Sequence, residues 1–153
     1  ALDQLFCDFK NNDLEVLILG VSNNQGFNRL INKPKFKYFG YVEDRELDAL
    51  YKNTYAFIYP SLNEGFGYPP LESMKHVTPV LASAIASITE ICGDAVIYFN
   101  PYCIQEIKNR ILMLFLQAGV WEKYAELGYR RYQEIAEKQD RALNDLCHLI
   151  LKD

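Results

Sequence analysis

The chain has 153 residues, of which 50% are hydrophobic and 24% are charged, and its formal net charge is -4. These values predict one soluble domain with a substantial core, and they argue against a broad nucleic-acid surface. No apolar run approaches the roughly 18 residues that a membrane-spanning helix needs. Four scattered cysteines without a C-x-x-C pair, and two histidines, show no metal-ligand spacing. We expect reduced, mostly packed cysteines and a cytosolic protein.

Short apolar segments alternate along the chain with segments of helical periodicity. In chain order we expect a helix over 2–9, a strand over 15–20, a helix over 25–32, a strand over 35–40, a helix over 44–51 capped by Asp44, a strand over 55–60, a helix over 69–76, a strand over 79–83, a helix over 87–91, a strand over 95–99, and helices over 104–115, 121–135 and 143–150. This alternation predicts an α/β fold with a doubly wound parallel sheet covered by helices on both faces. Without repeats or linkers, we expect a single domain.

The most informative segment of the sequence is 64–72, in which two carboxylates bracket a Gly-aromatic-Gly turn. Glu64 precedes the turn, and Glu72 follows it in a helix that begins at Pro69 or Pro70. A loop between a strand and a helix N-terminus presents backbone N–H groups and a positive helix end, which suit a diphosphate. The carboxylates can accept hydrogen bonds from the hydroxyls of a sugar or ribose. The segment therefore predicts a nucleotide-sugar site.

Each residue of this segment has an expected physical role. Gly65 and Gly67 lack a Cβ, so the chain can turn sharply and a ligand can approach the backbone closely. Glu72 is expected in the first helical turn, where the helix dipole favours a negative charge by ~0.3–1 kcal/mol. Neither carboxylate has an obvious nucleophilic or acid–base partner in this segment. Any chemistry at this segment is therefore expected to come from positioning a bound ligand and stabilising a departing anion.

Simpler explanations exist for the individual residues, and only their combination favours a ligand site. Helix-start electrostatics would explain Glu72, a solvated loop position would explain Glu64, and packing would explain Phe66. We expect His76 to interact with a helix C-terminus and the apolar positions of 121–135 to lie in the core. Basic residues expected on solvated surfaces are Lys35, Lys37, Lys108, Arg110, Arg130 and Arg131.

A set of further segments accompanies 64–72 in a recognisable order. They are Gly40-Tyr41-Val42, Glu46-Leu47-x-x-Leu50-Tyr51, Tyr59-Pro60-Ser61, the run EGFGYPPLESM over 64–74, Thr78-Pro79-Val80-Leu81-Ala82-Ser83, Glu90, Gly93-Asp94-Ala95 and Asn100-Pro101. In this order and approximate spacing they resemble the retaining glycosyltransferases of family 4, also called group 1. The resemblance covers residues 14 to 118 well and the C-terminal helices loosely.

The resemblance implies the C-terminal, donor-binding half of a GT-B enzyme, whose active site lies between two Rossmann-like domains. By position, Glu64 would lie near the donor sugar and position it for catalysis, and Glu72 would bind the ribose hydroxyls. The backbone at Gly65, Phe66, Gly67 and Tyr68 would face the sugar and the diphosphate. The nucleobase would lie against Gly40, Tyr41 and Val42.

The implied reaction is retaining transfer of a hexose from UDP or GDP to a glycan or lipid-linked acceptor, in the synthesis of cell-surface polysaccharide such as lipopolysaccharide. The family requires no metal or other cofactor, since the nucleotide-sugar is a substrate. We expect a cytoplasmic protein, with peripheral membrane association through the acceptor-binding half. Two alternatives remain open: a non-catalytic nucleotide-binding module, and a GT-B-fold sugar-nucleotide epimerase.

The sequence departs from the family pattern at two places. Val77 stands where the family usually has a glycine, so we expect an altered turn before the strand at 79–83. The chain also begins after the first strand and after the Arg/Lys loop of the family's domain. In a sheet of order 3-2-1-4-5-6 that strand is central. We therefore expect an N-terminally truncated domain that is nearly inactive by itself, unless residues 1–13 supply the strand.

Overall fold

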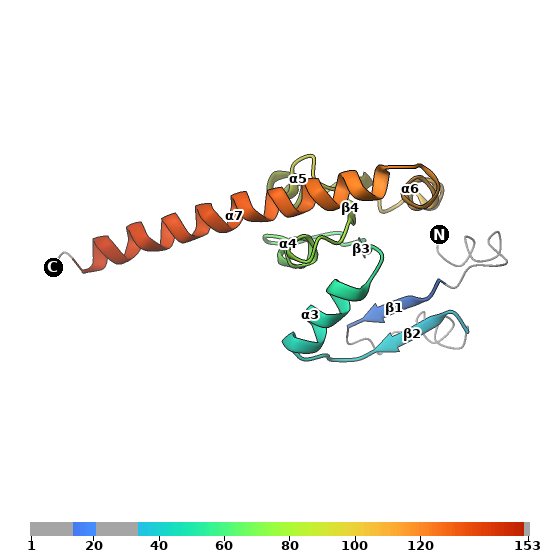
Figure 1. The fold of residues 1–153 in the computed structure, drawn as a ribbon, viewed down its shortest axis with the longest axis horizontal. Coiled ribbons are helices and arrows are strands. Elements are labelled where there is room, and N and C mark those ends of the chain that lie inside the picture. Colours follow the sequence, from blue (N-terminus) through green and yellow to red (C-terminus); the bar gives the residue numbers. More distant parts are fainter. Residues whose placement is uncertain (1–13, 21–33, 152–153) are drawn as a thin grey trace. The chain divides into compact units, whose positions relative to one another are not determined.

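The computed structural model of the chain describes residues 14–20 and 34–151. The helices predicted over 2–9 and 25–32, and the question of a strand within 1–13, lie outside the described residues. The chain divides into two compact units, Leu2–Ala49 and Leu50–Asp153. Each unit has its own parallel sheet, as Figure 1 shows.

The first unit contains a pair of parallel strands. Strand β1 (Val16–Leu19) pairs with β2 (Phe36–Phe39) in a register that places Val16 opposite Phe36. Phe36 is buried, while Lys37 points to the exposed side and forms an ion pair of 2.7 Å with Glu15 beside β1. Lys37 therefore lies on a solvent face as predicted, although it has a charged partner there.

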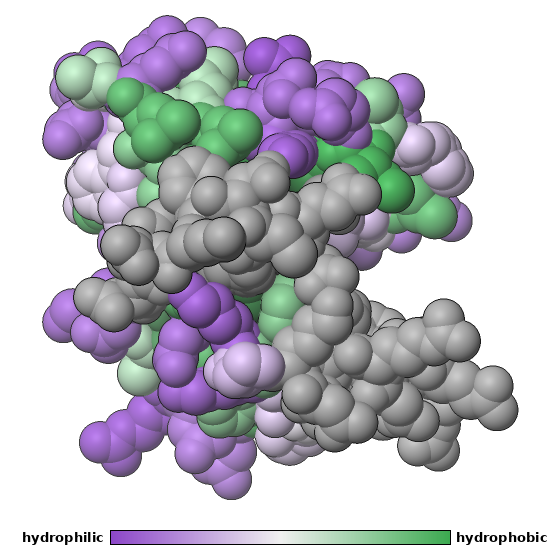
Figure 2. Space-filling model, turned by 90° about the vertical axis from the view of Figure 1, so that its right-hand side faces the viewer, coloured by the Kyte–Doolittle hydropathy of each residue, from purple (hydrophilic) through white to green (hydrophobic). Residues whose placement is uncertain are grey.

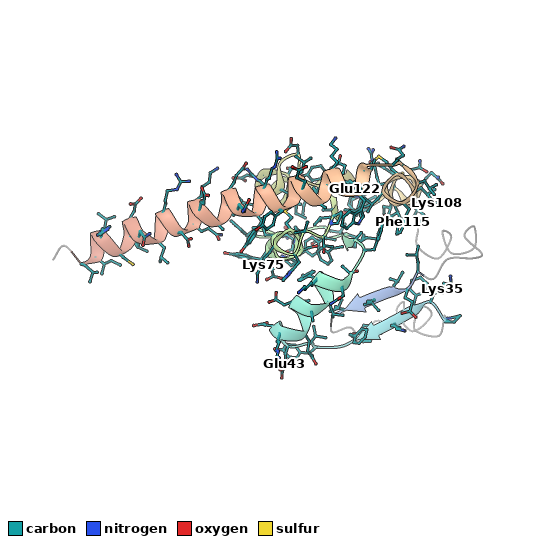
Figure 3. The ribbon with its side chains drawn as sticks, in the orientation of Figure 1. Lys35, Glu43, Lys75, Lys108, Phe115 and Glu122 are labelled. Atoms are coloured by element: carbon teal, nitrogen blue, oxygen red, sulfur yellow. The ribbon has the colours of Figure 1, made fainter. Side chains whose placement is uncertain are left out.

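Helix α3 (Asp44–Asn53) begins in the first unit and ends in the second. The prediction that Asp44 caps this helix is wrong by one residue. The carbonyl of Glu43 accepts the first helical hydrogen bond, from the N–H of Leu47, and the N–H of Glu43 donates to the carboxylate of Glu46. A side chain that reaches back three residues in this way fixes the helix start at Glu43, which is labelled in Figure 3.

The second unit contains a parallel sheet of three strands in the order β3-β4-β5. These are β3 (Phe57–Tyr59), β4 (Val80–Ser83) and β5 (Ile97–Phe99), and they alternate with the helices α4 (Tyr68–Lys75), α5 (Ala86–Cys92), α6 (Ile104–Leu116) and α7 (Val120–Ile150). The first unit pairs β1 with β2, and the second unit pairs β3, β4 and β5 in chain order, all in parallel. The predicted α/β class with parallel pairing is confirmed.

The core of the second unit forms around β4, whose residues are all buried. Leu71 and Met74 of α4, Ile88 and Cys92 of α5, and Ile135 of α7 belong to one buried cluster with Val80 and Ala82. Helices α4 and α7 lie side by side, and Gly128 permits their close approach, because a Cβ there would come within 3.1 Å of the Met74 side chain. The small and aliphatic residues of α7 therefore meet the core, while Trp121, Tyr124 and Tyr132 are only half-buried.

Helix α7 is a single helix of 31 residues, so the prediction of two helices over 121–135 and 143–150 is wrong. The intervening residues contain no Gly or Pro, and an ion pair joins Glu137 to Arg141 one helical turn later. From Glu137 onward the helix is exposed, including Leu143 and Leu146. In Figure 1 this end of α7 extends beyond the other elements of its own unit.

Aromatic residues join β3 to the α6–α7 corner. Tyr55 stacks on Phe115 of α6 with ring centroids 4.6 Å apart, and the Trp121 indole N–H donates to the Tyr55 carbonyl at 2.8 Å. Figure 3 labels Phe115 and the neighbouring Glu122, whose charge adds to the effect of burial in raising the pKa of Tyr55. Figure 2 shows hydrophobic patches among hydrophilic residues on one face of the described part.

Arg131 corrects another prediction, because it is not a solvated helix residue. Its guanidinium donates to the carbonyls of Ile91 at 2.6 Å and Glu90 at 3.1 Å, and it also pairs with Glu134 at 3.0 Å. These carbonyls belong to the last turn of α5, where a cation is favoured. The hydrogen bonds of Arg131 therefore connect α7 to the last turn of α5. Arg130, by contrast, is exposed and pairs with Glu126, as expected of a solvated position.

The cysteines that the structure describes are free: Cys92 is buried, Cys103 is half-buried and Cys147 is exposed, while Cys7 lies outside the described residues. Of these three described cysteines, only Cys92 is fully packed, and burial raises its pKa to about 11. Among the helices described, none has both the length and the apolar character that crossing a bilayer demands.

Helix α4 begins and ends with residues of positive φ. Gly67 precedes the helix with φ 98° and ψ 43°, and no side chain caps this end. Gly65 has no positive φ and no neighbour within 4 Å of a Cβ position. The predicted need for glycine in the turn therefore holds for Gly67, whereas the backbone conformation does not require glycine at position 65.

The end of α4 is a Schellman motif built on a valine. The N–H of Val77 donates to the Met74 carbonyl at 3.0 Å and that of Thr78 to the Ser73 carbonyl at 3.2 Å. Val77 itself has φ 62°, the left-handed region that glycine normally fills at this position. The turn thus keeps the geometry of a glycine turn, and the strain falls on the valine. The expectation of an altered turn is wrong in that respect. His76 caps the helix and stacks on Tyr51.

Replacement of Val77 by Gly is expected to raise the free energy of unfolding by about 0.5–1 kcal/mol. Relief of left-handed strain gains about 1–2 kcal/mol, and the greater freedom of glycine in the unfolded chain offsets about 0.5–1 kcal/mol. Val77→Ala keeps the Cβ and shortens a side chain that is 43% exposed, so it is the matched control, with a change within about 0.5 kcal/mol. Urea unfolding measures both variants. An equal gain from Ala and Gly would contradict the strain at this turn.

Two alanine substitutions in the glycine loop are expected to separate conformational from steric requirements. Gly67→Ala should lower the free energy of unfolding by about 1–2 kcal/mol, because a Cβ is disfavoured at its φ although space is available for it. Gly65→Ala should change stability by no more than about 0.5 kcal/mol. The same unfolding experiment tests the pair, and equal losses at both positions would be inconsistent with the backbone described here.

Candidate functional site

The glycine loop lies where ligands bind in parallel α/β sheets. It follows Tyr59, the last residue of β3, and leads into α4, so it stands at the carboxyl end of a parallel strand. Glu64, Phe66 and Glu72 are half-buried, while Gly65 and Tyr68 are exposed. The structure therefore brings together, within one unit, the two carboxylates and the loop that the sequence predicted as a site.

Glu64 is held by two hydroxyl groups. Its Oε1 accepts hydrogen bonds from the Tyr59 hydroxyl at 2.5 Å and from Ser61 Oγ at 2.7 Å. Hydrogen bonds to the charged form favour it, so Tyr59 first and Ser61 second lower the pKa of Glu64 against the opposing effect of burial. The interpretation of Glu64 as an unattached, solvated loop carboxylate is wrong.

Glu72 lies in the second turn of α4, not in the first, because the helix begins at Tyr68. The predicted benefit from the helix dipole therefore does not apply, since that effect falls off within the first turn. The side chain instead accepts a hydrogen bond from the Tyr51 hydroxyl at 3.3 Å. Tyr51 is buried and packs edge-on against Phe57 of β3, with ring centroids 5.2 Å apart. Glu72 is thus oriented by a rigid aromatic residue.

Tyr59 is under the influence of both carboxylates. Burial is the main cause of its raised pKa, the hydrogen bond and charge of Glu64 add to it, and the charge of Glu72 acts in the same direction. The hydroxyl therefore stays protonated and donates to Glu64 at neutral pH. A protonated Tyr59 hydroxyl donates to one oxygen of Glu64, and the carboxylate can still accept further hydrogen bonds from hydroxyl groups.

The backbone of the loop offers donors of the kind that an anionic ligand needs. Pro69 and Pro70 supply no N–H, so the available groups come from the loop itself. Among the residues that the structure describes, none accepts a hydrogen bond from the N–H of Phe66 or Gly67. The ring centroids of Phe66 and Tyr68 are 4.6 Å apart, and Phe66 is half-buried, so its side chain is partly packed against Tyr68.

The predicted nucleobase segment belongs to the first unit. Gly40, Tyr41 and Val42 directly follow β2 there, at the carboxyl end of a parallel strand. Gly40 is exposed, Tyr41 is 83% exposed and Val42 is half-buried. The three residues therefore occupy the corresponding end of their own sheet.

Sequence reasoning missed the three hydroxyl groups that hold the carboxylates, those of Tyr51, Tyr59 and Ser61. Tyr59 and Ser61 belong to the Tyr-Pro-Ser segment of the family resemblance, and Tyr51 belongs to its segment over 46–51. Tyr51 is 21 residues from Glu72, so its sequence position gives no sign of that partner, whereas Tyr59 and Ser61 are only five and three residues from Glu64. Within the described residues, no three His, Cys, Asp or Glu side chains are grouped so that they could hold a metal ion.

Comparison with curated proteins identifies relatives among sugar transferases. The chain is 40% identical over 89 residues to the O-antigen chain mannosyltransferase B of Escherichia coli, a match that covers 58% of this chain and 23% of that protein. It is 42% identical over 69 residues to the O-antigen chain mannosyltransferase RfbU of Salmonella typhimurium, with 45% and 20% covered. These matches span less than a quarter of either relative.

Solved structures of low sequence identity share the fold. A glycosyltransferase from Rickettsia africae aligns with a TM-score of 0.77 at 19% identity, over 98% of this chain and 43% of that chain. The Anabaena protein HepE, crystallised in complex with UDP-glucose, aligns with a TM-score of 0.68 at 17% identity, over 90% and 44%. The predicted GT-B type of α/β fold is confirmed.

The sequence profile of one family covers most of the chain. Residues 2–134 match the family described as glycosyl transferases group 1. This match includes both sheets, the glycine loop and the two carboxylates, and it agrees with the resemblance found from the sequence motifs. The chain therefore belongs to the group 1 glycosyltransferases.

Proposed function

We propose that this chain binds the nucleotide-sugar donor of a retaining hexosyltransferase. The observation that carries the proposal is the arrangement around the glycine loop: two carboxylates, each held by a tyrosine hydroxyl, flank a backbone with N–H groups that have no partner in the described residues. Carboxylates complement sugar and ribose hydroxyls, and backbone N–H groups complement a diphosphate. A nucleotide-sugar is the ligand that requires both.

In this proposal each residue contacts a different part of the nucleotide-sugar. Glu72 accepts hydrogen bonds from the ribose hydroxyls, and Glu64 accepts from a hydroxyl of the donor sugar. The backbone of Gly65, Phe66, Gly67 and Tyr68 lies against the sugar and the diphosphate. The assignment of Gly40, Tyr41 and Val42 to the nucleobase stays a prediction from the family resemblance. Glu64 acts by positioning the sugar, and the loop N–H groups stabilise the negative charge that develops on the departing diphosphate.

The donor is a UDP- or GDP-hexose. The enterobacterial relatives are named mannosyltransferases, which favours mannose as the sugar, whereas the HepE complex contains UDP-glucose. The acceptor is a glycan or a lipid-linked glycan in cell-surface polysaccharide synthesis, by analogy with the O-antigen enzymes. Transfer proceeds with retention and without a metal ion, in the cytoplasm. The acceptor-binding half supplies any peripheral attachment to the membrane.

Replacement of Glu72 by Ala is expected to weaken binding of the nucleotide by about 10- to 100-fold. A hydrogen bond to a charged acceptor is worth roughly 1.5–3 kcal/mol, and 1.4 kcal/mol corresponds to about tenfold. Calorimetric titration with UDP and GDP, without added metal, measures the effect and identifies the base. Glu126→Ala removes an exposed helical carboxylate far along the sequence and is the matched control. Equal affinities of the Glu72 and Glu126 variants would refute the ribose assignment.

Replacement of Glu64 by Ala is expected to lower transfer by the full-length protein on the order of 100-fold or more, because the sugar loses its positioning group. Affinity for the free nucleotide should change by less than about threefold, since Glu64 is assigned to the sugar. Turnover with radiolabelled donor and calorimetry with the free nucleotide are the two measurements. Unchanged turnover would exclude the enzyme function proposed here, and an epimerised donor without transfer would identify an epimerase instead.

A further inference from the structure

Glu64 is bound through one of its two carboxylate oxygens. Both hydroxyl donors, that of Tyr59 and that of Ser61, contact Oε1. Within the described residues, Oε2 accepts no hydrogen bond. The carboxylate therefore has one anchored oxygen and one oxygen that can accept a hydrogen bond from a ligand. Rotation of the side chain would break both anchoring bonds together.

The two anchors are themselves fixed by the fold. Tyr59 is the last residue of β3, opposite Ala82 of the buried strand β4, and its ring stacks on Phe57 with centroids 5.6 Å apart. Ser61 follows the strand, and its Oγ lies 3.3 Å from the carbonyl oxygen of Asn63. The strand end and the loop therefore each supply one donor to Oε1. The orientation of Glu64 is thereby set before any ligand binds.

We propose that Tyr59 and Ser61 are positioning residues of the transferase, which hold Glu64 Oε1 so that Oε2 faces a hydroxyl of the donor sugar. This inference rests on the function proposed above, because it needs Glu64 to contact the sugar. A preorganised hydrogen-bond acceptor lowers the barrier of the transfer reaction more than it strengthens binding of the donor. The two hydroxyls therefore affect kcat more than affinity for the donor.

The protonation states of these groups fit the same arrangement. Tyr59 and Ser61 lower the pKa of Glu64, while burial, Glu64 and Glu72 raise the pKa of Tyr59. Glu64 is therefore ionised and Tyr59 is neutral at neutral pH. Removal of the Tyr59 hydroxyl returns the pKa of Glu64 toward its ordinary value. As the pH falls, Glu64 of the variant is then protonated at a higher pH than in the wild type. Activity that needs ionised Glu64 is lost there, so the acid limb of the pH–activity profile moves to higher pH.

The test uses Tyr59→Phe and Ser61→Ala in the full-length protein. Each variant is expected to lower kcat on the order of tenfold, to change the donor KM by less than about threefold and to raise the pH of the acid limb. Because both hydroxyls donate to the same carboxylate oxygen, their contributions are coupled. The loss of kcat in the double variant should therefore be smaller than the product of the two single losses. Ser61→Thr keeps a hydroxyl at this position and should restore most of the activity.

A matched control comes from β5, which lies on the other side of β4 in the same sheet. The Tyr98 hydroxyl of β5 donates to the Gly93 carbonyl at 2.7 Å, so Tyr98→Phe removes a comparable tyrosine hydrogen bond away from the loop. This variant should retain its kcat and its pH profile even where stability falls. If Tyr59→Phe impairs folding, Ser61→Ala and Ser61→Thr still test the proposal, because Ser61 lies in a half-exposed loop position.

The outcomes separate this inference from the function on which it rests. If Tyr59→Phe and Ser61→Ala keep the wild-type kcat and acid limb while Glu64→Ala abolishes transfer, the positioning role is overturned and the function stands. If Glu64→Ala leaves transfer unchanged, the proposed function itself fails. If the donor KM rises and kcat stays constant, the hydroxyls contribute to binding alone, which also overturns the positioning role.

Discussion

The backbone conformation at the two ends of α4 constrains the whole site. Gly67 turns the chain into the helix at φ 98°, and Val77 turns it out at φ 62° toward the buried strand β4. Between these turns, Leu71 and Met74 lie in the core, while Glu72 remains half-buried on the same helix. The position of the glycine loop therefore depends on a helix that is packed on one side and bounded by two sharp turns.

Hydrogen bonds from hydroxyl groups stabilise the ionised carboxylate of Glu64. Burial and the negative charges of Glu64 and Glu72 raise the pKa of the Tyr59 hydroxyl, which therefore stays protonated. The hydrogen bonds from Tyr59 and Ser61 lower the pKa of Glu64, so it keeps its charge. A ligand rich in hydroxyl groups then meets an ionised and oriented acceptor at Glu64. The site thus combines hydrogen-bond acceptors at the carboxylates with donors along the loop backbone.

Local patterns predicted the strands and most of the helices well, and they failed where a distant partner decides. The α/β alternation, the parallel pairing and the glycine loop follow from short-range periodicity and from the conformational freedom of Gly67. Arg131 had the sequence context of a solvated helix residue, yet it binds the end of α5, which lies 40 residues earlier. The continuity of α7 was missed because its apolar residues form two separate groups, although no helix breaker lies between them.

The sequence by itself determined the family, the fold class and the identity of the two carboxylates, because these depend on residue types at fixed short spacings. Only the tertiary structure decided how the carboxylates are held. Tyr51 reaches Glu72 from another helix, and Tyr59 and Ser61 converge on one oxygen of Glu64 because a strand end and a loop meet there. The contact of Tyr51 with Glu72 depends on how two helices pack, and the periodicity of one helix contains no record of the other. The contacts of Tyr59 and Ser61 with Glu64 are close in sequence, but they depend on the path of the loop, which residue periodicity does not predict.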